Sequence, residues 1–196
     1  MSSPRKPVVR PVWSGFLARE AGRIVDASSS VTIIQASGKL IIVDTGAPSD
    51  RTRLVMSLKR MDVVPESVDC VVNTHMHFDH CGCNELFERA RLYAHELELP
   101  PAGTIRVRQR TSIAPGVELV PTPGHSPGSL SVFVEADVRV AICGDAIPTR
   151  DNFEKRVPPF INVDRKLALK SMEVIGSWAA MVIPGHDAPF NVVAKE

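Results

Sequence analysis

The hydrophobic residues of the chain form short β-branched runs, and two longer amphipathic stretches interrupt them. Residues 31–36 and 39–44 are apolar runs that flank the pair Ser37-Gly38. A two-residue connection of this kind predicts a β-hairpin, because glycine readily adopts the positive φ that tight hairpin turns require. The first half of the chain therefore begins with a pair of antiparallel strands.

Residues 50–61 follow this hairpin with the spacing of an amphipathic helix. Asp50 is a candidate cap for its first turn, and Pro65 is expected to end it. Residues 69–74 then read as a short buried strand, so that hairpin, helix and strand form one unit. The residues on the apolar face of the predicted helix are Leu54, Leu58 and Met61.

The second half of the chain repeats this order. A second helix is predicted from about residue 164 to 177, and residues 180–184 read as a last buried strand. The two halves therefore predict similar α/β units with a site between them. The inner face of the second helix is expected to contain Leu167, Ser171, Val174, Ile175 and Trp178. Further strands are predicted at 91–94, 104–110, 117–120, 129–135 and 138–143, the last two joined by a turn at Ala136-Asp137.

Composition places the chain among single-domain globular proteins. Its 196 residues carry a formal net charge of +1 and are 44% hydrophobic, and no run approaches the ~20 apolar residues of a membrane span. These values exclude a disordered or fibrous chain, and the low net charge argues against a protein that binds nucleic acid over much of its surface. The polar start and the scattered cysteines favour a cytoplasmic protein. Sixteen prolines against seven Asn and Gln residues favour a thermophilic source.

Three of the six histidines lie close together in the stretch His75-Met-His77-Phe-Asp79-His80. This stretch follows an apolar strand, so it forms a loop at the carboxyl edge of a sheet, where open α/β sheets place their ligands. Imidazole nitrogens and a carboxylate suit zinc, iron and manganese alike. Side chains at these spacings in a loop can face two neighbouring metal positions.

Two further histidines and one aspartate occupy similar places. His125 and His186 each follow a Pro-Gly pair in a loop, and Asp145 follows the strand predicted at 138–143. Five of the six histidines therefore lie in strand-end loops, which favours a joint metal site over isolated surface or core histidines. The sixth, His95, is expected on the surface.

With these residues in view, the sequence resembles the metallo-β-lactamase superfamily from about residue 31 to residue 190. Its histidines and aspartates follow the order of that family's metal motif, and Ile42-Val-Asp44-Thr-Gly46 resembles the family's first motif. The resemblance implies an α/β (α+β) fold of the αββα type, a sandwich of two mixed β-sheets with helices on the outer faces, as one domain over residues 1–196. It assigns His75, His77 and His125 to a first metal, Asp79, His80 and His186 to a second, Asp145 to a bridge between them, and Asp44 to the orientation of a ligand histidine.

The resemblance further implies a hydrolase that holds two divalent metal ions, with zinc expected and iron or manganese as alternatives. A hydroxide shared between two cations is a strong nucleophile near neutral pH, because the metals lower the pKa of water. Asp79 would orient this nucleophile and so act as a catalytic residue. The expected partners are small molecules with ester-type bonds, namely lactones, phosphodiesters or phosphotriesters, accepted with broad specificity.

Three other functions stay open at this point. An endonuclease of RNA or single-stranded DNA would share the metal site but needs a basic groove. A mononuclear iron oxidoreductase acting on sulfur compounds would share the histidine loop. A non-catalytic metal-binding protein would fill the same ligand positions. Small-molecule hydrolysis is favoured over nucleic-acid binding, no membrane partner is expected, and a homodimer stays open.

Local details narrow the branch of the superfamily. Class B1 β-lactamases resemble this order but carry cysteine where Asp145 stands, so antibiotic hydrolysis is not the expected function. Homoserine lactonases place a tyrosine beyond the bridging aspartate, whereas the single tyrosine here, Tyr93, precedes it. The ending Pro184-Gly-His-Asp-Ala-Pro-Phe190 resembles the group of metallo-β-lactamase domain-containing protein 1, which is associated with RNA cleavage.

Three remaining features carry weaker expectations. Residues 146–162 mix apolar and basic side chains and are expected either to line the substrate pocket, with Phe153 and Phe160 among its apolar members, or to form an ordinary loop. Cys81 and Cys83 are expected to pack rather than to bind metal. A charged edge strand, favoured over a phosphate-binding surface, is predicted for Arg106, Arg108 and Arg110.

Overall fold

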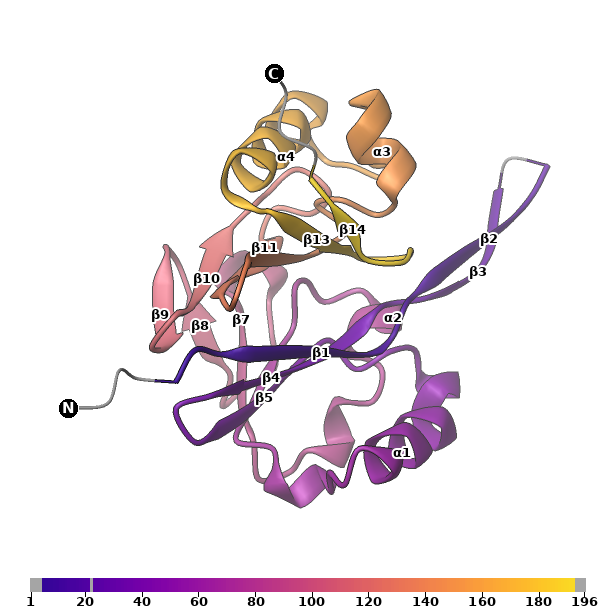
Figure 1. Cartoon of the computed structure of the whole chain (residues 1–196). Coiled ribbons are helices and arrows are strands. Elements are labelled where there is room, and N and C mark those ends of the chain that lie inside the picture. The colour runs from indigo at the N-terminus through magenta and orange to yellow at the C-terminus, as the bar shows by residue number, and fades with distance from the viewer. Residues whose placement is uncertain (1–4, 22, 193–196) are drawn as a thin grey trace.

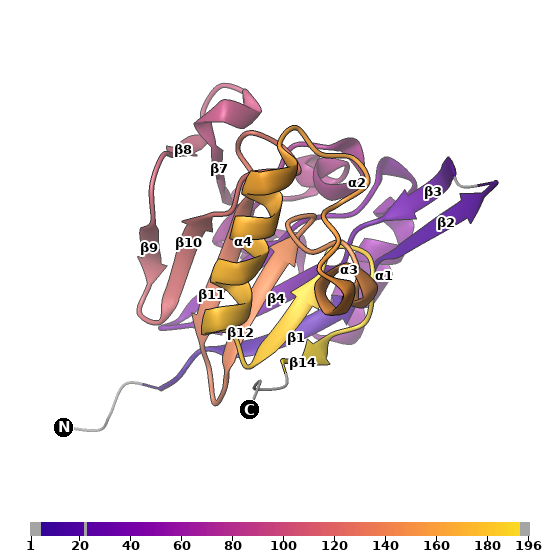
Figure 2. The same cartoon turned by 90° about the horizontal axis from the view of Figure 1, so that it is seen from above.

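Two six-stranded β-sheets face each other in the protein, and helices cover their outer faces (Figures 1 and 2). The computed structural model describes residues 5–21 and 23–192. Helix α1 (Arg51–Arg60) covers one sheet and helix α4 (Arg165–Trp178) covers the other. The αββα sandwich expected from the sequence is therefore confirmed.

Each sheet contains the repeated unit that the sequence predicts. In the first, β4 (Val31–Ala36) and β5 (Lys39–Val43) form a hairpin, and β6 (Cys70–Val72) returns parallel to β5 after α1. In the second, β11 (Leu130–Glu135) and β12 (Arg139–Gly144) pair, and β13 (Met181–Pro184) returns parallel to β12 after α4. The first sheet has the order β1-β4-β5-β6-β7-β8 and the second β14-β13-β12-β11-β10-β9. The other strands of the sandwich are β1 (Val8–Trp13), β7 (Arg91–His95), β8 (Ile105–Val107), β9 (Thr111–Ala114), β10 (Val117–Pro121) and β14 (Phe190–Asn191).

Neighbouring residues of the strands face opposite sides of the sheet and so build different layers. Ile34 and Ile41 are cross-strand partners in the core between the two sheets. Their neighbours Ile33 and Ile42 pair in the same way but pack against α1, together with Leu54. This two-residue period explains why the central strands read as continuous apolar runs, since both of their faces are buried.

Helix α1 agrees with its predicted apolar face but not with its predicted ends. Leu54 and Leu58 are fully buried, as expected. Asp50 stands at the N-cap position, yet its carboxylate accepts hydrogen bonds from the Ala47 backbone and the Ser28 hydroxyl instead of from the helix. The helix ends at Arg60, before Pro65, which begins a separate 3₁₀ turn. The capping prediction is therefore wrong, because a tertiary contact competes for the carboxylate.

Helix α4 is present, but its buried face is rotated from the one predicted. Ser171 and Ile175 are buried as expected, whereas Leu167 and Val174 are exposed. Ala168 is buried instead, in close contact with Gly124, where an added Cβ atom would lie 2.3 Å from the backbone nitrogen of Ala168. The side chain of Asp164 accepts a hydrogen bond from Leu167 N and caps the first turn.

The strand predicted over residues 104–110 is shorter than expected. Strand β8 ends at Val107, and the chain then turns into β9, which the sequence pattern did not indicate. β8 is an edge strand, as the charged pattern predicted. Two of the three arginines, Arg108 and Arg110, lie beyond its end and pair with Glu96 and Glu118.

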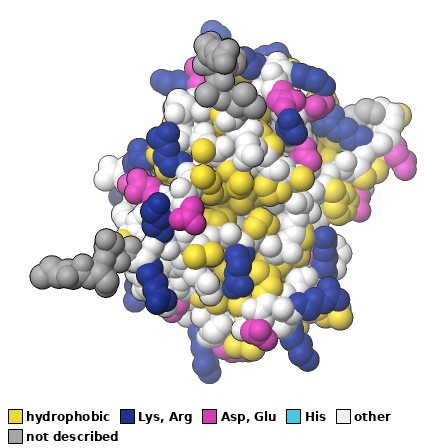
Figure 3. All heavy atoms as spheres, in the orientation of Figure 1, with side chains coloured by type: hydrophobic (Ala, Val, Ile, Leu, Met, Phe, Trp, Pro, Cys, Tyr) yellow, Lys and Arg dark blue, Asp and Glu magenta, His cyan; other side chains and the backbone are white. Residues whose placement is uncertain are grey.

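A two-stranded hairpin formed by β2 (Phe16–Glu20) and β3 (Arg23–Ser28) extends from the sandwich (Figure 1). On the same view, hydrophobic side chains gather at the surface along the seam between β1 and β14 (Figure 3). All four cysteines are free thiols. No helix among the described residues is long and apolar enough to cross a membrane.

Candidate metal centre

The strand ends bring the sequence-predicted site residues to one edge of the sandwich. Strands β5, β6 and β7 run parallel, and so do β12 and β13, so the carboxyl ends within each group meet. Asp44 follows β5, and the His75 loop follows β6. In the second sheet, Asp145 follows β12 and His186 lies beyond β13. Side chains separated by more than 100 positions therefore become neighbours.

Three imidazole nitrogens converge in the first group. His75 Nε2 lies 3.0 Å from His77 Nδ1, and His125 Nε2 lies 3.2 Å from His75 Nε2 and 3.0 Å from His77 Nδ1. The opposite nitrogen of His125, Nδ1, lies 2.8 Å from the carbonyl oxygen of Ile161 and can only donate to it. The proton on Nδ1 leaves the Nε2 lone pair of the neutral ring directed at the other two histidines.

Asp79, His80 and His186 form the second group. His80 Nε2 lies 3.4 Å from His186 Nε2, and Asp79 Oδ2 lies 3.6 Å from His186 Nε2. His186 Nδ1 donates to the backbone oxygen of Ser28 over 3.0 Å. Asp79 belongs to the short helix α2 (Phe78–Cys81), and His80 follows it there.

Asp145 stands between the two groups. Its Oδ1 lies 3.1 Å from His186 Nε2 and 3.4 Å from His80 Nε2, while its Oδ2 lies 3.5 Å from His125 Nε2. Oδ1 is buried and has no hydrogen-bond partner among the described residues. Burial raises the pKa of this carboxyl group, but His186 and His80 outweigh burial and hold the pKa well below its ordinary value. The group is therefore an ionised carboxylate.

Asp44 binds the nitrogen of His80 that faces away from the second group, Nδ1. Its Oδ2 accepts a hydrogen bond from His80 Nδ1 over 2.8 Å, and Thr74 donates to both of its oxygens from N and Oγ1. Burial lowers the pKa of His80, but Asp44 and Asp145 raise it well above its ordinary value. By contrast, burial and His80 lower the pKa of His75 well below its ordinary value.

The donor set fits divalent metal ions. Each group supplies three nitrogen or oxygen donors whose atoms lie within 4.8 Å of one another. A buried carboxylate needs positive charge around it, which His80 and His186 supply when protonated in the metal-free fold and which bound metal ions would supply in their place. The thiols of Cys81 and Cys83 instead donate to the backbone oxygens of Met76 and Ala47. Both cysteines therefore pack, as expected.

A small cavity of about 30 Å³ opens onto His125 and Asp145. Leu17, Arg19 and Ile24 of the β2–β3 hairpin form one wall. The sequence analysis did not predict this hairpin. The glycine of the pair Ala21-Gly22 is a turn signal, and the stretches before and after this pair contain β-prone residues. The other residues that line the cavity are Pro148, Asn152, Pro159, Phe160 and Ile161.

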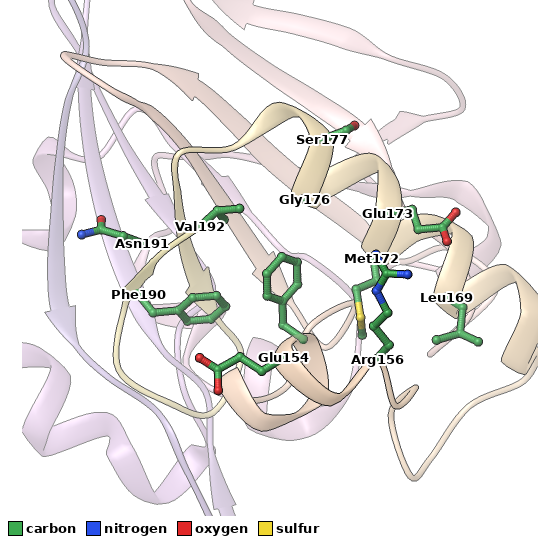
Figure 4. Close-up of a pocket in the computed structure, with 11 residues that line it drawn as sticks. Glu154, Arg156, Leu169, Met172, Glu173, Gly176, Ser177, Phe190, Asn191 and Val192 are labelled. Atoms are coloured by element: carbon green, nitrogen blue, oxygen red, sulfur yellow. The ribbon is translucent and has the colours of Figure 1, made fainter. Parts of the chain in front are cut away.

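The segment 146–162 divides its residues between two places. Part of it forms helix α3 (Arg150–Lys155) rather than an ordinary loop. Phe160 lines the metal-side cavity, as expected. Phe153 instead lines a separate groove of about 790 Å³. Figure 4 shows this groove, with Met172 and Phe190 among its labelled lining residues. This larger groove contains none of the converging histidines and aspartates.

His95 also differs from expectation. Its side chain is buried, and Nδ1 accepts a hydrogen bond from Leu97 N over 3.2 Å. It caps the 3₁₀ turn Glu96–Glu98 that follows β7, so its role is structural. A lone histidine carries no burial signal in sequence, because its neighbours in space come from elsewhere in the chain.

Comparison with known proteins identifies the family of this chain. The model of the metallo-beta-lactamase superfamily matches residues 24–106. A "Probable metallo-hydrolase" of Methanocaldococcus jannaschii is 35% identical over 189 residues, which cover 96% of this chain and 90% of that protein. The chain therefore belongs to the metallo-β-lactamase superfamily and is a metal-dependent hydrolase, as the resemblance implied.

Other relatives lie in two groups. The N-acyl homoserine lactonase of Bacillus thuringiensis is 31% identical over 212 residues, covering 94% of this chain and 84% of the lactonase. Metallo-beta-lactamase domain-containing protein 1 of Mus musculus is 34% identical over 195 residues, covering 93% and 73%. A solved structure of an N-acyl homoserine lactone hydrolase, with N-hexanoyl-L-homoserine bound at its catalytic metal center, superposes with a TM-score of 0.74 at 25% identity, covering 95% and 94%.

Proposed function

We propose that the protein is a binuclear metal-dependent hydrolase of carboxylic esters, with lactones as its first substrate class. The observation that carries this proposal is the convergence of seven side chains from both sheets, with Asp145 between two groups of donors. The first ion would be held by His75, His77 and His125, the second by Asp79, His80 and His186, and both by Asp145. All-nitrogen and oxygen ligands suit zinc, with iron or manganese as alternatives.

Two divalent ions bound here would supply a water of lowered pKa and a Lewis acid for a carbonyl oxygen. The chain's own residues do the positioning. Asp79, whose Oδ2 lies 3.6 Å from His186 Nε2 and 3.9 Å from His80 Nε2, would orient this water for attack. Asp44 keeps the proton of His80 on Nδ1, so Nε2 stays available as a donor.

The residues around the small cavity support an ester substrate with an apolar part. Leu17, Ile24 and Phe160 offer apolar contact next to His125 and Asp145. Two lines of comparison agree, since lactonases are among the relatives and one solved lactone hydrolase holds its product at a metal centre. The tyrosine that homoserine lactonases place beyond the bridging aspartate has no counterpart, so we expect lactone turnover without a phenolic group at the site.

The test is hydrolysis of N-hexanoyl homoserine lactone by zinc-loaded protein, followed with a pH indicator. Turnover is expected for the wild type and is lost in Asp145→Ala. Asp137→Asn is the matched control, because the Asp137 side chain is fully exposed in the β11–β12 turn and its one ion pair among the described residues is with Lys6 at 3.9 Å. A wild-type protein that holds two zinc ions but leaves the lactone intact would contradict the proposal.

Phosphodiester hydrolysis is the second candidate, and Arg19 favours it. Arg19 lines the cavity and has no acidic partner among the described residues, so its charge is available to an anionic substrate. Release of nitrophenol from bis(p-nitrophenyl) phosphate, with the same two variants, tests this activity. Nucleic acid is a less favoured partner, because Arg108 and Arg110 are already paired with acidic side chains.

A further inference from the structure

The three histidines of the first group come from two loops that belong to different sheets. His75 and His77 follow β6 of the first sheet, whereas His125 lies between β10 and β11 of the second. A metal site of tenths-of-ångström accuracy therefore needs something that fixes one loop relative to the other. Direct backbone pairing between the loops themselves is limited to a bond from Leu130 N to the oxygen of Thr74.

Glu98 lies between these two loops and bonds to both. Its Oε2 accepts a hydrogen bond from Met76 N over 3.0 Å, at the residue that separates His75 from His77. Its Oε1 accepts from Ser126 Oγ over 2.7 Å and from Gly128 N over 2.8 Å, just after His125. All three partners are donors, so the carboxylate is the matching acceptor on each side.

The approach of the His125 loop to Glu98 depends on a glycine. A Cβ atom at residue 128 would lie 2.8 Å from both Cγ and Oε1 of Glu98 and 3.0 Å from its backbone nitrogen. Contacts this short are closer than real side chains adopt, so only glycine permits the bond from residue 128. Ser126 is in turn held by Ser129, whose Oγ lies 2.7 Å from Ser126 Oγ and 3.1 Å from Ser126 N.

We propose that Glu98 is a positioning residue that sets the distance between the His75–His77 pair and His125, and thereby the metal affinity of the first group. This inference rests on the ligand assignment of the proposed function. Glu98 contacts none of the donor atoms and acts through the backbone of Met76 and the loop of Ser126. Outer partners of this kind typically change metal affinity by about 10- to 100-fold.

The test compares zinc binding by wild-type protein, Glu98→Gln and Glu96→Gln, each by competition with a chromophoric chelator. Glutamine preserves the shape of Glu98 but turns an NH₂ group towards at least one of the three donors. Glu96→Gln is the matched control, because Glu96 lies two positions away and its carboxylate pairs with the exposed Arg108 over 2.7 Å. We expect two zinc affinities for the wild type and for Glu96→Gln, and in Glu98→Gln a loss of about 10- to 100-fold at one of them only.

Asp44→Asn provides the contrast, because it acts on His80 in the other group. It should weaken the second affinity and leave the first unchanged, and the double variant should lower each affinity by the factor seen in the corresponding single variant. Ser126→Ala removes one of three donors and should give a smaller loss than Glu98→Gln. Thermal unfolding of the metal-free forms identifies any variant that fails to fold. If Glu98→Gln does not fold, Ser126→Ala replaces it in the comparison with the wild type.

Unchanged zinc affinities in Glu98→Gln would overturn the inference. An equal fall in both affinities would also overturn it, because Glu98 would then support the fold as a whole. If the wild type binds fewer than two ions, the ligand assignment fails and the inference fails with it. If the wild type binds two ions and Glu98→Gln weakens only one of the two affinities, but no ester is hydrolysed, the inference stands and the proposed substrate class fails.

Discussion

His80 Nδ1 and Asp44 Oδ2 lie 2.8 Å apart although 36 positions separate the two residues in the chain. Asp44 has a positive φ of 54°, which is uncommon outside glycine and places its carboxylate under the histidine loop. Thr74 donates to both oxygens of the same carboxylate, so three hydrogen bonds fix it in one orientation. The aspartate thus determines both the tautomer and the direction of the His80 ring.

From this contact we expect Asp44→Asn to weaken zinc binding by about 10- to 100-fold at one of two positions, because an amide cannot hold the His80 proton as a carboxylate does. Competition with a chelating dye measures the affinity. Asp137→Asn is the control, since Asp137 is exposed on the far hairpin turn. Equal zinc affinities in Asp44→Asn and the wild type would show that His80 is oriented without Asp44.

Zinc binding should release protons near pH 7. The pKa of His80 in the metal-free fold lies well above its ordinary value of 6.5, and the pKa of His186 is also raised. A protonated imidazole must lose a proton before that nitrogen can bind a metal ion, so zinc affinity should rise with pH through these raised values. Calorimetry in two buffers of different ionisation enthalpy counts these protons.

The same shift predicts how the stability of the metal-free protein depends on pH. A raised folded-state pKa of His80 contributes stability that is fully present below about pH 6.5 and is lost as the pH rises through the folded value. Asp44→Asn should reduce both this contribution and the number of protons released by zinc. Zinc binding without proton release at pH 7 would contradict the raised pKa values.

Arg19→Ala should alter substrate selection rather than the metal site. Arg19 lines the cavity beside Asp145 and has no acidic partner among the described residues, so its loss should raise KM for an anionic ester and leave KM for a neutral lactone unchanged. Arg23→Ala is the matched control, because Arg23 lies on the same hairpin but does not line the cavity. Steady-state kinetics give KM for both substrates in each variant. Equal changes in KM for the anionic ester in Arg19→Ala and Arg23→Ala would exclude a specific role for Arg19.

Leu58→Ala should destabilise the fold by about 2–5 kcal/mol, because Leu58 is fully buried between α1 and the first sheet. Val55→Ala lies on the same helix with 40% exposure and should change the free energy of unfolding by about 0.5 kcal/mol or less. Urea unfolding gives the free energy of unfolding of each variant, and the two values can be compared when the dependence of this free energy on urea concentration is the same as in the wild type. A loss of stability that is similar in both would mean that α1 does not pack as described.

The sequence by itself determined the residues of the candidate metal centre and the repeated organisation of the two halves. Histidine and aspartate spacing is local, and strand ends can be read from apolar runs, so His75 to His80, His125, Asp145 and His186 could be named without a structure. The β4–β5 hairpin followed from Ser37-Gly38, whose φ values of 50° and 79° suit its tight turn. Each of these features depends on neighbours along the chain.

Only the tertiary structure decided which surfaces meet. The buried face of α4, the turn of Asp50 away from its helix, and the division of residues 146–162 between two cavities all depend on contacts with distant segments. Glu98 carried no signal, because a glutamate after a strand is ordinary until its oxygens meet Met76 and Ser126. Hydrogen bonds and close packing between separate loops are properties of the folded chain, so a linear pattern contains the ligands but not the contacts that hold them in place.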